Sequence, residues 1–272
     1  MTKRFRMIAG PNGSGKSTLF RLLRRDYAVN FYAMLNSDDI FAEVARTGAY
    51  SPALPISEES LRSFVADSEY SDQTKGYFLK GDITVKDDTV HFESPGSVNT
   101  YTVALLTNFL QQEHIATGKS FSQETVFSHP SKIEALRVAK ESGYRTYLYF
   151  VANSDISINI ARIANRVRSG GHDVPVDKVG ARAKRCMENV KRALPYCSRA
   201  YFFDNSGIEM RFLAEYSEAL PLFFNQSPPF VGVWRFSRQN PPPHPRRSRL
   251  PLHRHDDRHR RLHLRQHPPR NL

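Results

Sequence analysis

The most constraining feature of this chain is a glycine-rich segment near its start, where residues 10–17 read GPNGSGKS. The segment fits the pattern G-x-x-x-x-G-K-[ST], in which backbone N–H groups and a following helix N-terminus surround phosphate oxygens. An ordinary Gly/Ser turn can match the same letters. Here, however, the segment lies between an apolar run at 4–9, typical of a strand, and an amphipathic run at 16–26, typical of a helix. That context favours a phosphate loop and predicts nucleotide binding.

The motif also assigns roles to individual residues. Lys16 is expected to reach the β- and γ-phosphates, and the Ser17 hydroxyl is expected to ligate Mg²⁺. ATP, as a substrate, and Mg²⁺ are therefore the predicted cofactors. The predicted nucleotide-binding residues are Gly10, Pro11, Asn12, Gly13, Ser14, Gly15, Lys16, Ser17 and Thr18.

Strand-like and helix-like segments alternate along the rest of the chain, which predicts an α/β fold with a parallel sheet and helices on both faces. One helix is expected at 130–143, where Pro130 and Ser131-x-x-Glu134 suggest a capping box. The other expected strands and helices are a strand ending at Leu35 with a helix after it, a helix at 99–113, a strand at 121–125, a strand at 145–152, a helix at 156–168 and a strand at 200–204.

Two stretches interrupt this alternation. Residues 50–96 are expected to form a small insertion, in which Asp87-Asp88 between two strand-like runs suggests a β-hairpin. From Pro228 onward lie nine of the 17 prolines and six of the ten histidines. Because such a segment offers little apolar surface for folding, we expect a kinase-like domain at 1–226 and a disordered Arg/His/Pro-rich tail at 227–272. The abrupt change of composition also suggests that the tail is an extension that is either out of frame or artificially added to the natural chain.

The distribution of charge narrows the classes of partner. The formal net charge of +12 invites a nucleic-acid partner, but residues 229–272, with eleven Arg and two Asp, carry +9 of it, and 1–228 carry only +3. A nucleic-acid-binding ATPase that uses the tail is thus the less favoured alternative. No apolar run approaches the roughly 18–20 residues that span a bilayer, so no membrane partner is expected. Two cysteines with no metal-ligand spacing are typical of a cytoplasmic protein.

Carboxylates follow two of the predicted strands. Asp38, in Asn36-Ser37-Asp38-Asp39, can accept a substrate hydroxyl proton during phosphoryl transfer, or it can cap the helix that follows. Glu124 and Thr125 end the strand at 121–125, where they can bind sugar hydroxyls or simply form the polar end of a strand. The carboxyl ends of parallel strands meet at one edge of a sheet, which is where open α/β sheets bind ligands.

A pair of arginines precedes a glycine hinge. Arg162 and Arg166 lie one turn apart on a predicted helix whose isoleucines occupy another side, and Gly170-Gly171 follow. Helix, hinge and second helix form the layout of a lid that closes over phosphates, where arginines neutralise charge on the transferred group. The alternative is a solvated basic face on a surface helix.

Taken together, these motifs resemble those of the zeta toxin family of P-loop kinases, the toxins of bacterial toxin–antitoxin pairs. The segments that carry the resemblance are AGPNGSGKSTL, the N-x-D at 36–38, Glu124-Thr125, SGYRTYLYFV, RxxxRVxxGGHxVP at 162–175 and DNSG at 204–207. The resemblance covers about 1–50 and 97–210.

The resemblance implies an ATP-dependent kinase that phosphorylates a hydroxyl of a UDP-N-acetyl sugar, typically UDP-N-acetylglucosamine, and so blocks cell-wall precursor synthesis. It implies that Lys16 holds the ATP phosphates and that Asp38 is the catalytic base. It also implies that Glu124 and Thr125 contact the sugar nucleotide, that Arg162 and Arg166 are catalytic lid arginines, and that an antitoxin is the protein partner. A P-loop kinase of another small hydroxyl compound, such as an antibiotic or nucleoside, is the alternative.

Overall fold

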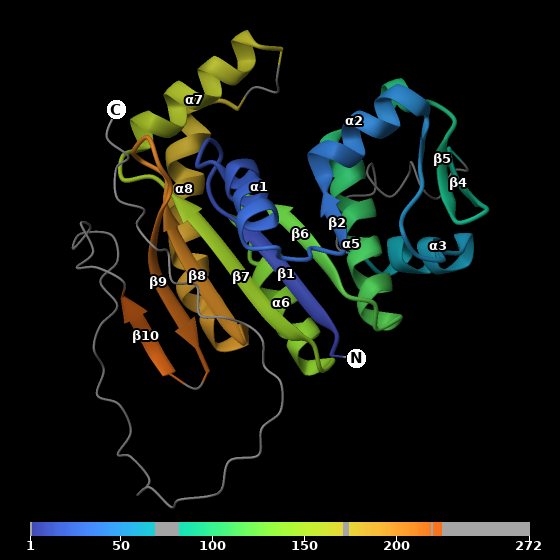
Figure 1. The fold of residues 1–272 in the computed structure, drawn as a ribbon. Helices are drawn as coiled ribbons and strands as arrows, with labels where there is room; N and C mark the ends of the chain where they lie inside the picture. Colours follow the sequence, from blue (N-terminus) through green and yellow to red (C-terminus); the bar gives the residue numbers. More distant parts are fainter. Residues whose placement is uncertain (1, 69–81, 171–173, 219, 225–272) are drawn as a thin grey trace, which may run out of the picture. The chain divides into compact units, whose positions relative to one another are not determined.

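A mostly parallel β-sheet organises the structure, a computed structural model that describes residues 2–68, 82–170, 174–218 and 220–224 (Figure 1). All of these residues belong to one unit, which spans Met1–Gln226. The tail predicted at 227–272 lies outside the described residues.

The sheet has seven strands in the order β10-β9-β8-β7-β1-β6-β2. Five of them are parallel, namely β1 (Arg4–Ala9), β2 (Ala33–Asn36), β6 (Phe121–Thr125), β7 (Arg145–Ala152) and β8 (Arg199–Asp204). The other two, β9 (Arg211–Ser217) and β10 (Leu220–Phe224), are antiparallel and extend one edge. The expected α/β fold with a parallel sheet is therefore confirmed, and the two antiparallel strands at that edge are an addition that the sequence did not predict.

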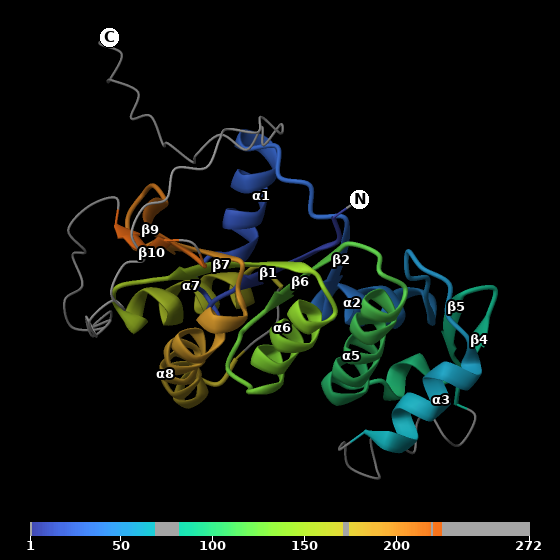
Figure 2. The same cartoon turned by 90° about the horizontal axis from the view of Figure 1, so that it is seen from below.

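Helices cover both faces of the sheet, as predicted (Figure 2). One face carries α1 (Lys16–Asp26), whose buried Leu19 and Leu23 share that side of the helix. On the opposite face, Phe5 of β1 and Phe121 of β6 stack with ring centroids 4.4 Å apart. The helices on that second face are α5 (Thr100–Ala116), α6 (Ser131–Glu141) and α8 (Val176–Ala193).

Two further helices begin at the carboxyl edge of the sheet. The first is α2 (Ser37–Thr47), which follows β2 directly, and the second is α7 (Ile156–Arg168), which follows β7. The side chain of Asp155 caps α7 by accepting a hydrogen bond of 2.8 Å from the backbone N–H of Ser157. This edge therefore gathers the ends of five strands and the starts of several helices, the arrangement that binds ligands in open α/β sheets.

The predicted insertion contains a second, smaller β-sheet and a helix. It contains β3 (Ala49–Tyr50), α3 (Glu58–Asp67), β4 (Ile83–Lys86), β5 (Thr89–Phe92) and a short 3-10 helix at Pro95–Ser97. Its strands make a three-stranded sheet in the order β3-β5-β4. Asp87 and Asp88 have φ angles of 48° and 57°, as a tight hairpin turn with two left-handed residues requires, so the expected hairpin is confirmed. Residues 69–81 of the insertion lie outside the described residues.

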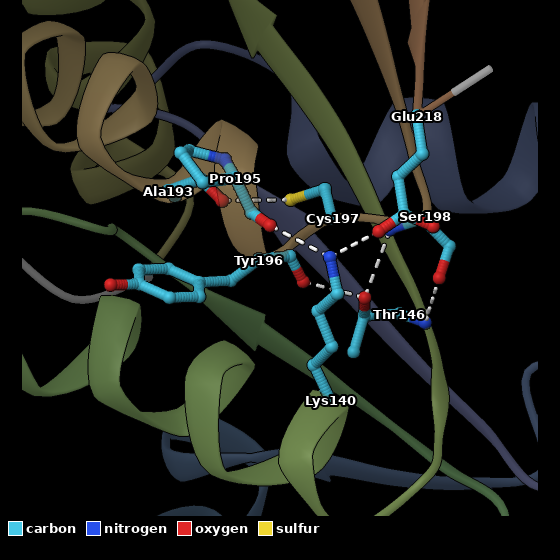
Figure 3. Close-up of polar contacts among 8 residues, drawn as sticks. All are labelled: Lys140, Thr146, Ala193, Pro195, Tyr196, Cys197, Ser198 and Glu218. Atoms are coloured by element: carbon cyan, nitrogen blue, oxygen red, sulfur yellow. Dashed lines mark hydrogen bonds and ion pairs between the residues drawn. The ribbon is translucent and has the colours of Figure 1, made fainter.

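The connection from α8 to β8 is fixed by polar contacts at the end of the sheet opposite the phosphate loop (Figure 3). Thr146 donates through its hydroxyl to the carbonyl of Tyr196 at 2.6 Å and accepts from the backbone N–H of Ser198 at 3.0 Å. Lys140 donates to the carbonyl of Pro195 at 2.8 Å and pairs with Glu218. These contacts align β8 with β7. Both cysteines, Cys186 and Cys197, are free thiols and are buried.

The expected capping box at the start of α6 is wrong. Ser131 is the first helical residue, and Pro130, at the N-cap, makes no side-chain hydrogen bond. The backbone N–H of Ser131 instead donates to Nδ1 of His129 at 3.2 Å, and Glu134 pairs with Arg137. The histidine side chain thus takes the place of the serine hydroxyl.

Across the described ranges, none of the helices is both long enough and apolar enough to cross a membrane.

Candidate nucleotide and acceptor site

The glycine-rich segment forms a tight loop between β1 and α1. Gly15 has φ +98° and is the N-cap of α1, and Gly13 has φ +75°. A Cβ atom at Gly13 would lie 2.5 Å from the carbonyl oxygen of Asn159, and one at Gly15 would lie 2.0 Å from Nδ2 of Asn205. Both positions therefore require glycine for their backbone conformation and for the close approach of neighbouring atoms. Such a loop before a helix N-terminus can surround a phosphate group.

Three asparagine side chains contact the carbonyl groups of this loop. Asn159 donates to the Asn12 carbonyl at 2.6 Å, and Asn205 donates to the Ser14 carbonyl at 2.9 Å. Asn153 donates to the Gly13 carbonyl at 3.3 Å. None of these asparagine amides was predicted as a site group, because they come from three separate segments, although Asn205 lies in the DNSG segment at 204–207.

Lys16 lies at the start of α1, and its ammonium group donates to the carbonyl of Pro11 at 3.4 Å. Burial lowers the pKa of Lys16, while the charges of Glu124 and Asp38 oppose that shift and the charge of Arg166 adds to it. Residues that are far apart in the sequence thus lie close enough to Lys16 for their charges to act on its ammonium group. Ser17 and Thr18, the next residues of α1, are exposed.

Asp38 is not the cap of α2. The cap is Asn36, whose side-chain oxygen accepts from the backbone N–H of Asp38 at 3.0 Å. Asp38 lies in the first helical turn and is exposed, and in the described part of the chain its carboxylate has no hydrogen bond or ion pair. The alternative role that the sequence left open, a helix cap, is therefore wrong, and the carboxylate is available to a ligand.

Glu124 lies at the carboxyl end of β6, opposite Ile8 of β1 on one side and Asn36 of β2 on the other. It is half-buried. Burial raises the pKa of Glu124, the charge of Lys16 opposes this, and the charges of Asp39 and Asp38 reinforce it. Glu124 is thus more than a solvated strand end, because it shares its electrostatic environment with the phosphate loop.

The residues just after Glu124 are held firmly by neighbouring elements. The hydroxyl of Thr125 accepts from the backbone N–H of Phe127 at 3.4 Å, and Phe127 is buried with φ +66°. From α8, the Cys186 thiol donates to the carbonyl of Val126 at 2.7 Å and Asn189 donates to the carbonyl of Phe127 at 3.0 Å. Burial raises the pKa of the Cys186 thiol to about 12, so it is present as the neutral hydrogen-bond donor.

The two candidate lid arginines differ in their surroundings. Arg162 donates to the side-chain oxygen of Asn153 at 3.3 Å and to the carbonyl of Asn205 at 2.8 Å, so it does not belong to a purely solvated face. Arg166, one turn further along α7, is exposed, and its charge lowers the pKa of Lys16. The glycine hinge is only partly visible, because residues 171–173 lie outside the described residues.

Fold and site together define an α/β protein of the P-loop class. No family model matches the chain. An uncharacterized protein of Haemophilus influenzae is 36% identical over 74 residues, which are 27% of this chain and 50% of that protein, so the chain spans about half the length of this curated relative.

Among solved structures, the fold is similar to one from the PezAT chromosomal toxin–antitoxin system of Streptococcus pneumoniae, at 13% identity and a TM-score of 0.45 over 77% of this chain and 72% of that one. It is also similar to the AvrRxo1-ORF1:-ORF2 complex with ATP, at 14% identity and a TM-score of 0.47 over 82% of this chain and 61% of that one. Because both TM-scores are below 0.5, the proposals below rest on the residues of this chain.

Proposed function

We propose that this protein is an ATP-dependent phosphotransferase that acts on the hydroxyl group of a small molecule. The observation that carries this proposal is the position of Lys16, which lies in a phosphate loop and within electrostatic range of Asp38 and Glu124 at the same edge of the sheet. A phosphate loop alone is compatible with switches and motors as well as kinases. The two nearby carboxylates supply what a kinase needs in addition, namely groups that bind and deprotonate an acceptor.

On the nucleotide side, the loop at 10–15 and the N-terminus of α1 bind the phosphates of ATP, and Lys16 contacts the β- and γ-phosphates. Ser17 fits the magnesium role, because its hydroxyl is exposed in the first turn of α1. No group of three or more His, Cys, Asp or Glu residues in the described ranges is arranged to hold a metal. Mg²⁺ usually takes few protein ligands and completes its shell with phosphate and water oxygens, and it supplies charge neutralisation when bound.

On the acceptor side, Asp38 takes the proton of the attacking hydroxyl group. The acceptor oxygen forms a bond to the γ-phosphorus, the bond to the β,γ-bridging oxygen breaks, and ADP leaves. Glu124 and Thr125 orient the acceptor through hydrogen bonds. Arg162 and Arg166 neutralise the charge of the transferred group, which in related systems contributes about 10³–10⁵-fold in rate.

For the acceptor we propose a UDP-N-acetyl sugar, with UDP-N-acetylglucosamine as the first candidate. The motifs at 36–38, 124–125 and 162–175 support this, because they resemble those of zeta toxins. The same resemblance supports a role as a toxin that blocks cell-wall precursor synthesis and an antitoxin as protein partner.

The test is incubation with Mg·ATP and a panel of UDP-sugars, nucleosides and aminoglycoside alcohols, with mass spectrometry to detect the gain of one phosphoryl group. We expect product with UDP-N-acetylglucosamine, and at least ~10²-fold less with Lys16→Ala or Asp38→Asn, since both residues act on the transferring group. Matched controls are Arg21→Ala, an exposed cation on the same helix as Lys16, and Asp67→Asn, an exposed carboxylate at the end of α3. Full activity of Asp38→Asn would refute its role as base, and product only with another alcohol would replace the proposed acceptor.

A further inference from the structure

The outer side of the phosphate loop is held by asparagine side chains from three separate segments of the chain. Three successive carbonyl groups, those of Asn12, Gly13 and Ser14, each accept a hydrogen bond from an asparagine amide. The donors come from three places. Asn153 follows β7, Asn159 is a buried residue of α7, and Asn205 follows β8. We call these three residues the asparagine clamp.

The geometry of a trans peptide gives this clamp a consequence for ligand binding. The carbonyl and the N–H of one peptide group point in opposite directions. When Asn159 holds the Asn12 carbonyl, the N–H of Gly13 is directed away from the clamp, and Asn205 does the same for the N–H of Gly15. Free N–H groups on the inner side of such a loop are the ones that bind phosphate oxygens.

The third peptide group of the loop is used internally. The N–H of Ser14 donates to the carbonyl of Pro11 at 3.2 Å, while Asn153 holds the carbonyl of Gly13 on the other side. This contact closes the turn. The clamp therefore orients two N–H groups toward a ligand and stabilises the turn between them.

Two glycines of the loop leave room for clamp residues. The missing side chain of Gly15 leaves room for the side-chain amide of Asn205, which would lie 2.0 Å from an added Cβ atom, and that of Gly13 leaves room for the backbone carbonyl of Asn159, which would lie 2.5 Å away. The loop sequence and the clamp are thus fitted to each other. An ordinary turn with the same sequence would not need glycine for this reason, because no asparagine would lie against it.

The clamp is one connected network. Asn153 donates to the side-chain oxygen of Asn159 at 3.0 Å, which fixes the orientation of both amides. Arg162 donates both to the side chain of Asn153 and to the backbone carbonyl of Asn205, so it joins the members that follow β7 and β8. A change at one member is therefore expected to reach the others.

We propose that Asn153, Asn159 and Asn205 are positioning residues that hold the phosphate loop in the conformation that binds the nucleotide triphosphate. This inference rests on the proposed function in one respect, the binding of ATP at the loop. It does not depend on the identity of the acceptor.

The experiment uses the full chain and measures the Kd for Mg·ATP by calorimetry without any acceptor. The variants are Asn159→Asp and Asn205→Asp, which keep the size of the side chain but place a carboxylate oxygen where the amide donates. We expect the Kd to rise about 10-fold or more in each, as for loss of a buried hydrogen bond with one partner left unsatisfied. Asn165→Asp is the matched control, since it makes the same change at an exposed site of α7, and its Kd is expected to stay within about twofold of wild type.

A second readout separates positioning from a general loss of structure. With an acceptor present, the KM for ATP should rise in the clamp variants while the KM for the acceptor stays unchanged. Partial unfolding would instead lower the rate per total protein and leave both KM values as they are. If the Asp variants do not fold, Asn159→Ser and Asn205→Ser take their place, because the shorter hydroxyl does not reach the loop carbonyl, and the same outcomes apply.

Folded clamp variants that bind Mg·ATP with the wild-type Kd would refute the positioning role of the asparagine clamp while leaving the proposed function intact. Wild-type protein that binds no Mg·ATP would overturn the proposed function, and the clamp with it.

Discussion

His114 of α5 makes the stability of this protein sensitive to pH. The imidazole is only 1% exposed and stacks on Phe121, with ring centroids 4.9 Å apart and an interplanar angle of 14°. Within the described residues neither ring nitrogen has a hydrogen-bond partner. Burial lowers the pKa of His114 from 6.5 to about 4, and the charge of Lys119 adds to this shift. The folded protein therefore keeps the ring neutral at pH values where the unfolded chain protonates it.

The sign and size of the effect follow from this difference in pKa. Because the folded-state pKa is the lower one, the contribution of His114 is fully present above the ordinary pKa of 6.5 and is lost as the pH falls toward 4. A drop from 6.5 to about 4 corresponds to about 3 kcal/mol of unfolding free energy when the loss is complete. Between pH 7 and pH 5 the expected loss is roughly 2 kcal/mol.

Urea unfolding of the full chain, followed by circular dichroism at pH 7 and pH 5, measures this loss. Carboxylates and other histidines also titrate, so the informative quantity is the comparison with His114→Phe, which keeps an aromatic ring against Phe121 but cannot be protonated. The free energy of unfolding should fall by roughly 2 kcal/mol less in the variant than in the wild type between these pH values. Parallel losses in the two proteins would show that His114 is not the sensitive group.

Three further changes test the backbone of the site and its neighbours. Gly15→Ala, at φ +98° and with its Cβ 2.0 Å from the Asn205 amide, should cost roughly 1–3 kcal/mol and abolish the thermal shift caused by Mg·ATP; an unchanged shift would contradict the fit described above. Gly180→Ala, in α8 with nothing within 4 Å of the added carbon, should instead stabilise the protein by about 0.5–1 kcal/mol in chemical unfolding, and a loss would show an unseen neighbour. Asn36→Ala removes the cap of α2 and should lower the free energy of unfolding by about 1 kcal/mol. The KM for the acceptor should rise as well, because Asp38 lies in the first turn of that helix. Unchanged stability would argue against the cap.

Much of the fold could be predicted because local signals and tertiary structure agree. The helix expected at 16–26 is α1, and the helix expected at 156–168 is α7, with the same bounds. The isoleucine stripe of α7 was only partly right, because Ile163 is buried whereas Ile156 is 37% exposed. A periodic pattern shows which side of a helix is apolar, but the neighbours decide how far along its length that side is covered.

The antiparallel edge of the sheet gave no such signal. In β9, residues 211–217 read RFLAEYS, where charged and apolar residues do not alternate strictly. A strand added antiparallel beyond the parallel part of a sheet is defined largely by pairing with its neighbours, here β8 and β10, so its own sequence constrains it weakly. A sequence pattern cannot report a partner that is supplied by β8.

The candidate site likewise has features that the sequence predicts and features that only the folded structure shows. The loop motif and the carboxylates at strand ends were visible in the sequence, because each belongs to one short segment whose place in a parallel sheet is known in advance. The asparagine clamp was not visible, since an asparagine after a strand usually serves a turn. Only the folded chain brings Asn153, Asn159 and Asn205 to consecutive carbonyl groups.

The charges around Lys16 also indicate how nucleotide binding affects the two carboxylates, Glu124 and Asp38. Burial alone destabilises both charges of the Lys16–Glu124 pair, because it lowers the pKa of Lys16 and raises the pKa of Glu124. Each charge is then partly stabilised by the other. In the proposed complex, the phosphates of ATP would bring further negative charge to Lys16, which favours its protonated form. They would at the same time disfavour the ionised form of Glu124. A protonated Glu124 can donate a hydrogen bond to an acceptor oxygen, whereas the exposed Asp38 remains the group suited to accept a proton. Nucleotide binding is therefore expected to prepare the two carboxylates for different tasks, one as a donor to the acceptor and the other as its base.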